Sequence, residues 1–203
     1  MKRLLFFLGI IFISLSIFSQ DFYRSYDHHD ILIGYGQFIP DQFKSVNTTM
    51  LNDLYPDQRY VRDHYSSAGA LFITYRHIFK NELFLWGITA GISNSKSEIY
   101  NVGQFVGELK RQFISIAIEW DYRYVNQGPI QVYSGFGVGF TFATETLTPP
   151  PEMSTNPSTA NISNIAYQIN AVGLRLGKKY AGFIELGYGY KGIINVGFSV
   201  QLF

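Results

Sequence analysis

Eight segments in which apolar side chains alternate with small or polar ones follow one another along the chain beyond residue 20. Alternation with a period of two is typical of β-strands whose two faces meet different surroundings. Most of the segments have nine to thirteen residues. A usual strand has only about five or six residues, whereas a tilted strand that crosses a bilayer needs about 9–11. The predicted strands are Asp30–Phe38, Ser67–Phe79, Leu83–Asn94, Leu109–Val125, Ile130–Thr144, Ile165–Leu176, Tyr180–Tyr190 and Ile193–Phe203.

The links between these segments alternate in length, which places all long loops at one end of an up-and-down meander. The final link, Lys191–Gly192, is short although it lies on the long-loop side. From the strand lengths and the alternation of link lengths, we predict an all-β fold: an eight-stranded antiparallel up-and-down transmembrane β-barrel. The other links are, in chain order, long Ile39–Ser66, short Lys80–Glu82, long Ser95–Glu108, short Asn126–Pro129, long Glu145–Asn164 and short Gly177–Lys179.

The two faces of each segment indicate which one meets lipid. One face carries large aliphatic and aromatic side chains, and the other is mainly Gly, Ala, Ser and Thr with a few charges. A soluble ligand-binding barrel would need a well-charged outer face, whereas small residues suit the narrow lumen of an eight-stranded barrel. The large residues are thus predicted to face lipid, and the segment Ile165–Leu176 loses phase between Ile169 and Val172, which indicates a bulge. Rings predicted to form two interfacial girdles are Trp120, Tyr122 and Tyr124 at the short-turn end and Phe140, Phe142, Tyr188 and Tyr190 at the other.

The first residues have the form of an export signal. Lys2 and Arg3 precede the apolar run Leu4–Phe18, and the small residue Ser19 precedes polar Gln20. We expect a cleaved signal peptide at residues 1–19 and a barrel domain at 20–203. An uncleaved anchor helix is the alternative, although the run is short for a span of ~20 residues.

Composition excludes several function classes. Charged residues make up 15% of the chain with a net charge of +1, so nothing indicates a nucleic-acid partner. Cys is absent, which removes disulfides, thiolate metal ligands and thiol nucleophiles. No nucleotide-binding loop, zinc-protease motif or nucleophile elbow is present, and no cofactor is expected.

With its long alternating strands and short turns, the chain resembles the small outer-membrane β-barrel superfamily, of the outer-membrane protein A and X type, over its whole length after the signal. The resemblance implies export, insertion by the barrel assembly machinery, and a Gram-negative outer membrane with its lipids and lipopolysaccharide as surroundings. It also implies that a terminal aromatic residue acts as an assembly signal, and Phe203 matches. The chain departs from the family pattern because the apolar residues Val196, Phe198, Val200 and Leu202 have the opposite parity to Phe203.

Inward-facing charges form the first candidate constellation. Carboxylates in a lumen are costly unless they are paired, and Arg residues are available to pair with them. We predict a salt-bridged plug, with a proton or ion path as the alternative. The residues are Arg76, Glu119, Asp121, Arg123 and Glu185, with Arg175 as a further candidate.

Two other motifs contain residue types that can carry chemistry. "YDHHD" (Tyr26–Asp30) holds metal-ligand residue types, but neighbours on an extended chain point to opposite sides, so no metal site is predicted. "HYSSAG" (His64–Gly69) is similar to the H-x-S-N element of outer-membrane lipid A deacylases, with His64 as base and Ser66 as nucleophile. Ser67 stands in place of the Asn, and the required acid is not evident nearby.

These observations favour a non-catalytic outer-membrane barrel with a structural, adhesive or accessory role, exerted through long extracellular loops on a partner in the envelope. Two alternatives remain open at this point: a lipid A-modifying enzyme that uses His64 and Ser66, and a narrow ion pore.

Overall fold

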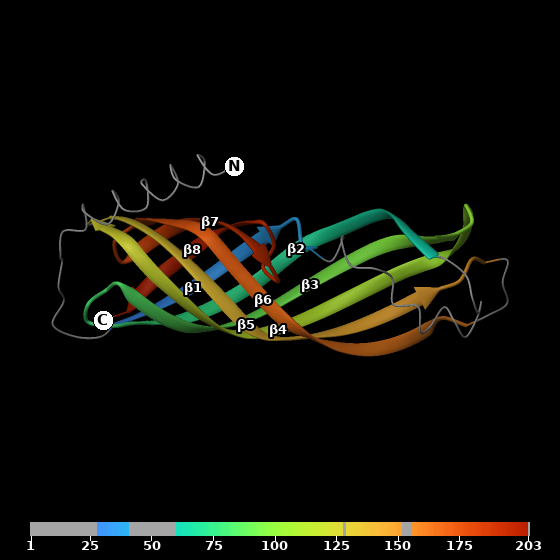
Figure 1. Cartoon of the computed structure of the whole chain (residues 1–203), viewed down its shortest axis with the longest axis horizontal. Helices are drawn as coiled ribbons and strands as arrows, with labels where there is room; N and C mark the ends of the chain where they lie inside the picture. The colour runs from blue at the N-terminus through green and yellow to red at the C-terminus, as the bar shows by residue number, and fades with distance from the viewer. Residues whose placement is uncertain (1–27, 41–59, 128, 152–155, 203) are drawn as a thin grey trace, which may run out of the picture.

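The computed structural model describes residues 28–40, 60–127, 129–151 and 156–202. Its strands close into one antiparallel barrel in which each strand pairs with its sequence neighbours and the last pairs with the first (Figure 1). The predicted eight-stranded barrel is therefore confirmed. The predicted signal segment and Phe203 lie outside the described residues. The strands are β1 (His28–Gln37), β2 (Tyr60–Ile78), β3 (Phe84–Asn101), β4 (Gln104–Gln127), β5 (Ile130–Thr148), β6 (Ser158–Gly177), β7 (Tyr180–Gly189) and β8 (Ile194–Leu202).

The barrel wall has two heights. β1, β7 and β8 have nine or ten residues, whereas β2 to β6 have 18 to 24 and continue well past the others (Figure 1). We call this continuation of β2 to β6 the extension. No described helix is both long enough and apolar enough to cross a bilayer.

The extension corrects the predicted loop Ser95–Glu108, which is mostly strand. β3 and β4 stay paired to Asn101 opposite Gln104, with one register shift between Ile99 and Tyr100, and the two-residue turn Val102–Gly103 joins them. Both turn residues have positive φ, 48° and 79°, as a tight hairpin with the twist of its strands requires. The prediction failed because the outer face changes here from apolar to polar residues, so the apolar alternation disappears while the strand continues.

A belt of exposed apolar side chains surrounds the lower part of the wall. Its upper limit lies between two rows of paired residues: Ile92, Ile114 and Phe142 form the last apolar row, and Asn94, Gln112 and Thr144 form the first polar row. On β4 the belt runs from Ile114 to Tyr122, about 21 Å along the barrel axis for a strand rise of ~3.4 Å and a tilt of ~40°. This height is near the ~25 Å apolar band of transmembrane barrels.

Bulges explain where the predicted faces were right and wrong. The register shifts between Asn170 and Val172, which confirms the predicted bulge in β6. A second shift between Arg123 and Val125 turns Tyr124 inward, where it is 6% exposed, so its assignment to a girdle was wrong. Tyr190 was also wrongly assigned to a girdle, because its hydroxyl donates a hydrogen bond to Glu119 inside the lumen.

Candidate functional site: the lumen charges and the extension

Inside the belt, the lumen holds a balanced set of buried charges. Four cations face four carboxylates, and all eight side chains are almost fully buried. They come from β1, β2, β4, β6, β7 and the turn between β7 and β8. Because a narrow lumen offers little water, such charges are tolerated only when they are paired. The cations are Arg76, Arg123, Arg175 and Lys191, and the carboxylates are Asp30, Glu119, Asp121 and Glu185.

Arg76 joins two acids on opposite sides of the lumen. Its Nε lies 2.9 Å from Oδ2 of Asp121, and its Nη2 donates to Oε1 of Glu185 at 2.9 Å. The guanidinium also lies 5.0 Å from the ring centre of Tyr133, whose hydroxyl donates to the same Glu185 oxygen at 2.7 Å. A planar guanidinium can serve both carboxylates at once, which a lysine ammonium cannot do in this geometry. Arg76 thus ties β2 to β4 and β7.

Lys191 is the cation that the sequence did not indicate. It follows β7 in a turn at the upper edge of the belt, and its side chain enters the lumen. Its Nζ donates to Oε2 of Glu119 at 2.7 Å and lies 3.7 Å from Oε2 of Glu185. The Tyr190 hydroxyl donates to the other oxygen of Glu119. Turn residues have no strand parity, so no sequence pattern could have shown that this lysine points inward.

A second group of charges lies at the seam where β8 meets β1. Arg175 Nε donates to the Ser199 hydroxyl at 2.7 Å and lies 3.4 Å from Oδ2 of Asp30. Asp30 has the parity of inward-facing Leu32, so the alternation of its strand could have identified it. Arg123 is buried on the same inner face, and its Nη1 has no hydrogen-bond partner in the described part of the chain.

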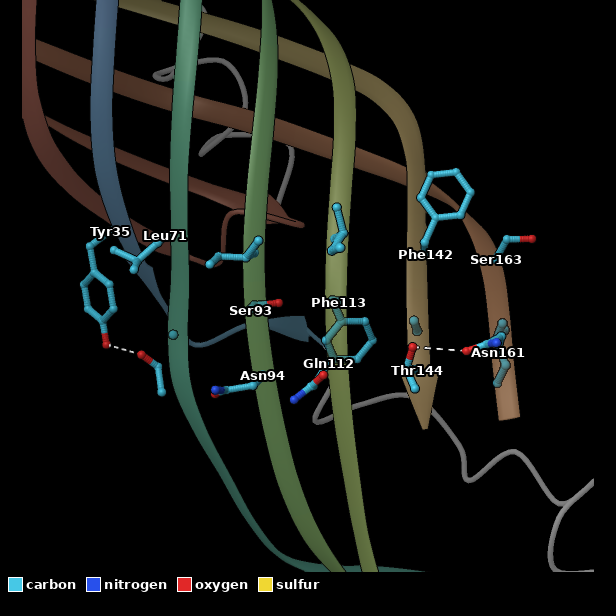
Figure 2. A pocket seen from close by; sticks show the side chains of 16 residues that line it. Tyr35, Leu71, Ser93, Asn94, Gln112, Phe113, Phe142, Thr144, Asn161 and Ser163 are labelled. Atoms are coloured by element: carbon cyan, nitrogen blue, oxygen red, sulfur yellow. Dashed lines mark hydrogen bonds between the residues drawn. The ribbon is translucent and has the colours of Figure 1, made fainter. Parts of the chain in front are cut away.

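Above the charges, the wall has two cavities. Ile39 and Pro40, which follow β1, line a small cavity of about 60 Å³ together with Tyr190. A larger cavity of about 730 Å³ lies at the base of the extension (Figure 2). Ser93 and Phe113 line both cavities. None of the side chains lining the larger one is a Lys, Arg, His, Asp or Glu, so this cavity provides no acid–base pair for catalysis.

The residues considered for deacylation lie on the extension. His64 sits in a bulge with φ 49°, and its Nδ1 is 2.9 Å from Oε2 of Glu98 on β3. Tyr100 donates to the same oxygen at 2.6 Å. The structure therefore supplies the acid that was not evident in the sequence, because strand pairing brings it from 34 positions further along the chain. No hydrogen bond joins Ser66 to His64, although both residues are described.

The height of His64 also separates it from the apolar belt. Its partner Glu98 lies six residues beyond Ile92, the last apolar residue on the outer face of β3. Six residues of tilted strand correspond to about 15 Å above the belt. His64 therefore lies on the polar extension and not at the apolar belt.

The histidines of "YDHHD" diverge, as adjacent residues on a strand should. His28 is 1% exposed and faces the lumen, whereas His29 faces outward, with Nδ1 2.8 Å from the Tyr75 hydroxyl. His77 pairs with His29 in register and lies beside Trp86. Within the ranges that the structure describes, no group of three or more His, Asp or Glu could hold a metal ion.

Comparison with known proteins adds one similar fold. No protein-family model matches the chain, and no curated protein matches it. Among solved structures, the crystal structure of Ail, the attachment invasion locus protein of Yersinia pestis, is similar with a TM-score of 0.42 and 12% identity. The similarity covers 87% of this chain and 97% of that one. At this level of similarity, the fold assignment rests on the strand order itself, and the role of the chain must be argued from its own surfaces.

Proposed function

We propose that this protein is an outer-membrane β-barrel that acts without catalysis, through the extension, as an adhesive or accessory surface on the cell exterior. The observation that carries the proposal is the division of one continuous wall into an apolar belt and a polar extension. A closed barrel satisfies every backbone group within the belt, as a bilayer demands. Exposed Ile, Phe and Val side chains in that belt would be a severe liability in water.

The extension has two strand edges that favour a protein partner. β1 pairs with β2 only as far as Ala70, so Tyr60–Gly69 of β2 pairs only with β3 among the described residues. In the same way, β7 pairs with β6 only from Gln168 onward, so Ser158–Ala166 pairs only with β5. A strand at the edge of a sheet can accept an extended segment of another chain by β-strand addition.

The outer face of the extension suits an aqueous setting. Glu108 contacts Lys96 on the neighbouring strand β3 and, at 3.2 Å, Lys110 two residues further along β4. The hydrogen bond from Lys96, supported by Lys110, lowers the pKa of Glu108 below its ordinary value. Thr144 donates to Asn161 at 3.1 Å on the neighbouring pair of strands (Figure 2). Polar ladders of this kind continue the outer face of the sheet beyond the belt.

Topology provides the first test. An epitope inserted at the turn Val102–Gly103, where Val102 is 91% exposed, should be labelled on intact cells. The matched control is the same epitope between Lys178 and Lys179, which should be labelled only after the outer membrane is permeabilised. The protein should also fractionate with outer membranes and migrate differently on gels with and without heating. Recovery in the soluble periplasm would contradict the proposal.

The role of the edge is tested by photo-crosslinking from Val61, which lies on the edge segment of β2 and is 62% exposed. A discrete protein adduct is expected in intact cells, and it should disappear when Ser95–Arg111 is replaced by an Asn-Gly turn. A crosslinker at Ile116 in the belt is the control and should capture lipid only. If Val61 captures no protein when the barrel is correctly inserted, the partner role is wrong.

A further inference from the structure

The outer surface of the belt contains a groove over β6, β7, β8 and β1. Its volume is about 600 Å³, and all its lining residues are Ile, Leu, Val, Phe, Tyr or Gly. One paired row crosses all four strands: Leu176 on β6, Gly182 on β7, Phe198 on β8 and Ile33 on β1. The three side chains of this row are 51%, 78% and 61% exposed, respectively. Gly182, with no side chain, therefore leaves a gap between Leu176 and Phe198.

Gly182 marks the floor of the groove. A Cβ built there would meet only the backbone oxygen of Gly197, at 3.9 Å. Most other glycines of the barrel would place a Cβ within 3 Å of a neighbouring atom. The absence of a side chain at Gly182 is therefore not required by packing, and its effect is to keep the groove open toward the surroundings of the belt.

A basic turn lies at the lower end of the groove. Lys178 and Lys179 are exposed and follow Leu176 by two and three positions. The buried Arg175 donates to the backbone oxygens of Gly177 at 3.2 Å and Lys178 at 3.0 Å, which holds the turn in one conformation. An apolar groove that ends at two cations on a fixed turn matches a molecule with an acyl chain and an anionic head group.

We propose that this groove, together with Lys178 and Lys179, binds one anionic glycerophospholipid of the leaflet at the short-turn end of the barrel. The inference rests on the proposed membrane location. Every belt residue meets acyl chains, but a groove contacts a chain on several sides and so gains more dispersion contacts than a flat surface. The two lysines select the head group, because each basic side chain near an anionic surface favours binding by about fivefold.

The test is competitive lipid retention by the full mature chain, refolded in detergent and incubated with equal amounts of phosphatidylglycerol and phosphatidylcholine. Native mass spectrometry then counts the bound lipids. The wild type should retain one phosphatidylglycerol in preference to phosphatidylcholine. Gly182→Phe fills the groove and should reduce total retention at least fivefold. The double variant Lys178→Gln/Lys179→Gln should lose most of the preference between head groups while retaining lipid.

Two control variants match these changes elsewhere on the barrel. Ala90→Phe adds the same ring to an exposed belt position on β3, and Lys80→Gln removes a lysine from another short turn. Both should retain phosphatidylglycerol as the wild type does. Unchanged retention in Gly182→Phe, or an equal loss in Ala90→Phe, would overturn the groove, and an unchanged preference in the lysine variant would overturn the head-group assignment. A chain that never gives a heat-modifiable band would refute the barrel proposal and the groove with it, whereas folded variants with unchanged retention refute the groove alone.

Discussion

Replacing Arg76 with Met should destabilise the barrel more than replacing any surface cation. The substitution keeps most of the side-chain volume and removes a charge that contacts Asp121 and Glu185, each at 2.9 Å. Loss of one partner from a buried pair costs about 3–5 kcal/mol, because the remaining charge stays desolvated. That range corresponds to a factor of roughly 10²–10⁴ in the equilibrium constant for unfolding.

The two acids should not suffer equally. Lys191 Nζ still lies 3.7 Å from Glu185, whereas Asp121 has no second ion-pair partner among the described residues. Neutralising the carboxylate that is left without a cation should restore stability. We therefore expect Asp121→Asn to rescue the Arg76→Met barrel by at least half of the lost free energy, and Glu185→Gln to rescue it less.

The assay is urea unfolding of the barrel in lipid vesicles, followed by the fluorescence of the two Trp residues of the chain, which lie at 86 and 120, and by the gel shift on heating. Arg76→Lys should fall between Met and wild type because it keeps the charge without the two-sided contact. Lys80→Met, at an exposed turn, is the control and should change stability by less than ~0.5 kcal/mol. A loss below ~1 kcal/mol for Arg76→Met, or equal rescue by both second substitutions, would refute the assignment of Arg76 as the link between these acids.

Three further predictions concern other parts of the chain. Gly36→Ala should destabilise the barrel by about 3 kcal/mol or more in urea unfolding, because the new Cβ would lie 1.7 Å from the Lys191 carbonyl oxygen. If the variant unfolds at the same urea concentration as the wild type, the β7–β8 turn must move freely. Deletion of Phe203 should reduce the fraction of chain inserted in the outer membrane in cells, and normal insertion would show that strand register alone is read. Because the pKa of Glu108 is lowered, its contacts with the two lysines stabilise the β3–β4 hairpin at neutral pH and are lost as pH falls through the lowered pKa. The protection factors of Lys96–Glu108 in hydrogen exchange, which correct for the intrinsic pH dependence of amide exchange, should thus stay constant from pH 7 to about 5 and fall only below the ordinary carboxyl range. A fall near neutrality would contradict this origin.

The surroundings of His64 bear on the enzyme alternative, and the contents of the lumen bear on the pore alternative. His64 has an acid partner in Glu98, but Ser66 is not bonded to it. The pair lies about 15 Å above the apolar belt. Paired charges cross the lumen, and Ile39 and Pro40 line a small cavity of about 60 Å³.

Period-two alternation and short turns were enough to predict the barrel, its strand number and the face that carries the apolar belt. They are local properties, since each residue's face follows from its neighbours on the same strand. The same rule failed wherever a residue left the regular strand. The bulge after Arg123 reversed the face of Tyr124, and the turn after β7 sent Lys191 into the lumen. The polar extension was predicted as loop because its outer face loses the apolar alternation. Its strand pairing nevertheless continues to Asn101, and an inner apolar cluster remains, made of Ile99, Val106, Leu109 and Leu147.

Contacts between distant segments could be decided only by the tertiary structure. The sequence placed Arg76, Asp121 and Glu185 on inner faces, but which acid meets which cation depends on the register of strands that are far apart in the chain. A shift of one residue would turn each of them to the other face. Closure of β8 on β1 likewise brought Asp30 to Arg175, and the pairing of β2 with β3 brought Glu98 to His64. The sequence by itself determined the type of wall, and the closure and register of that wall decided which groups meet inside it and on its surface.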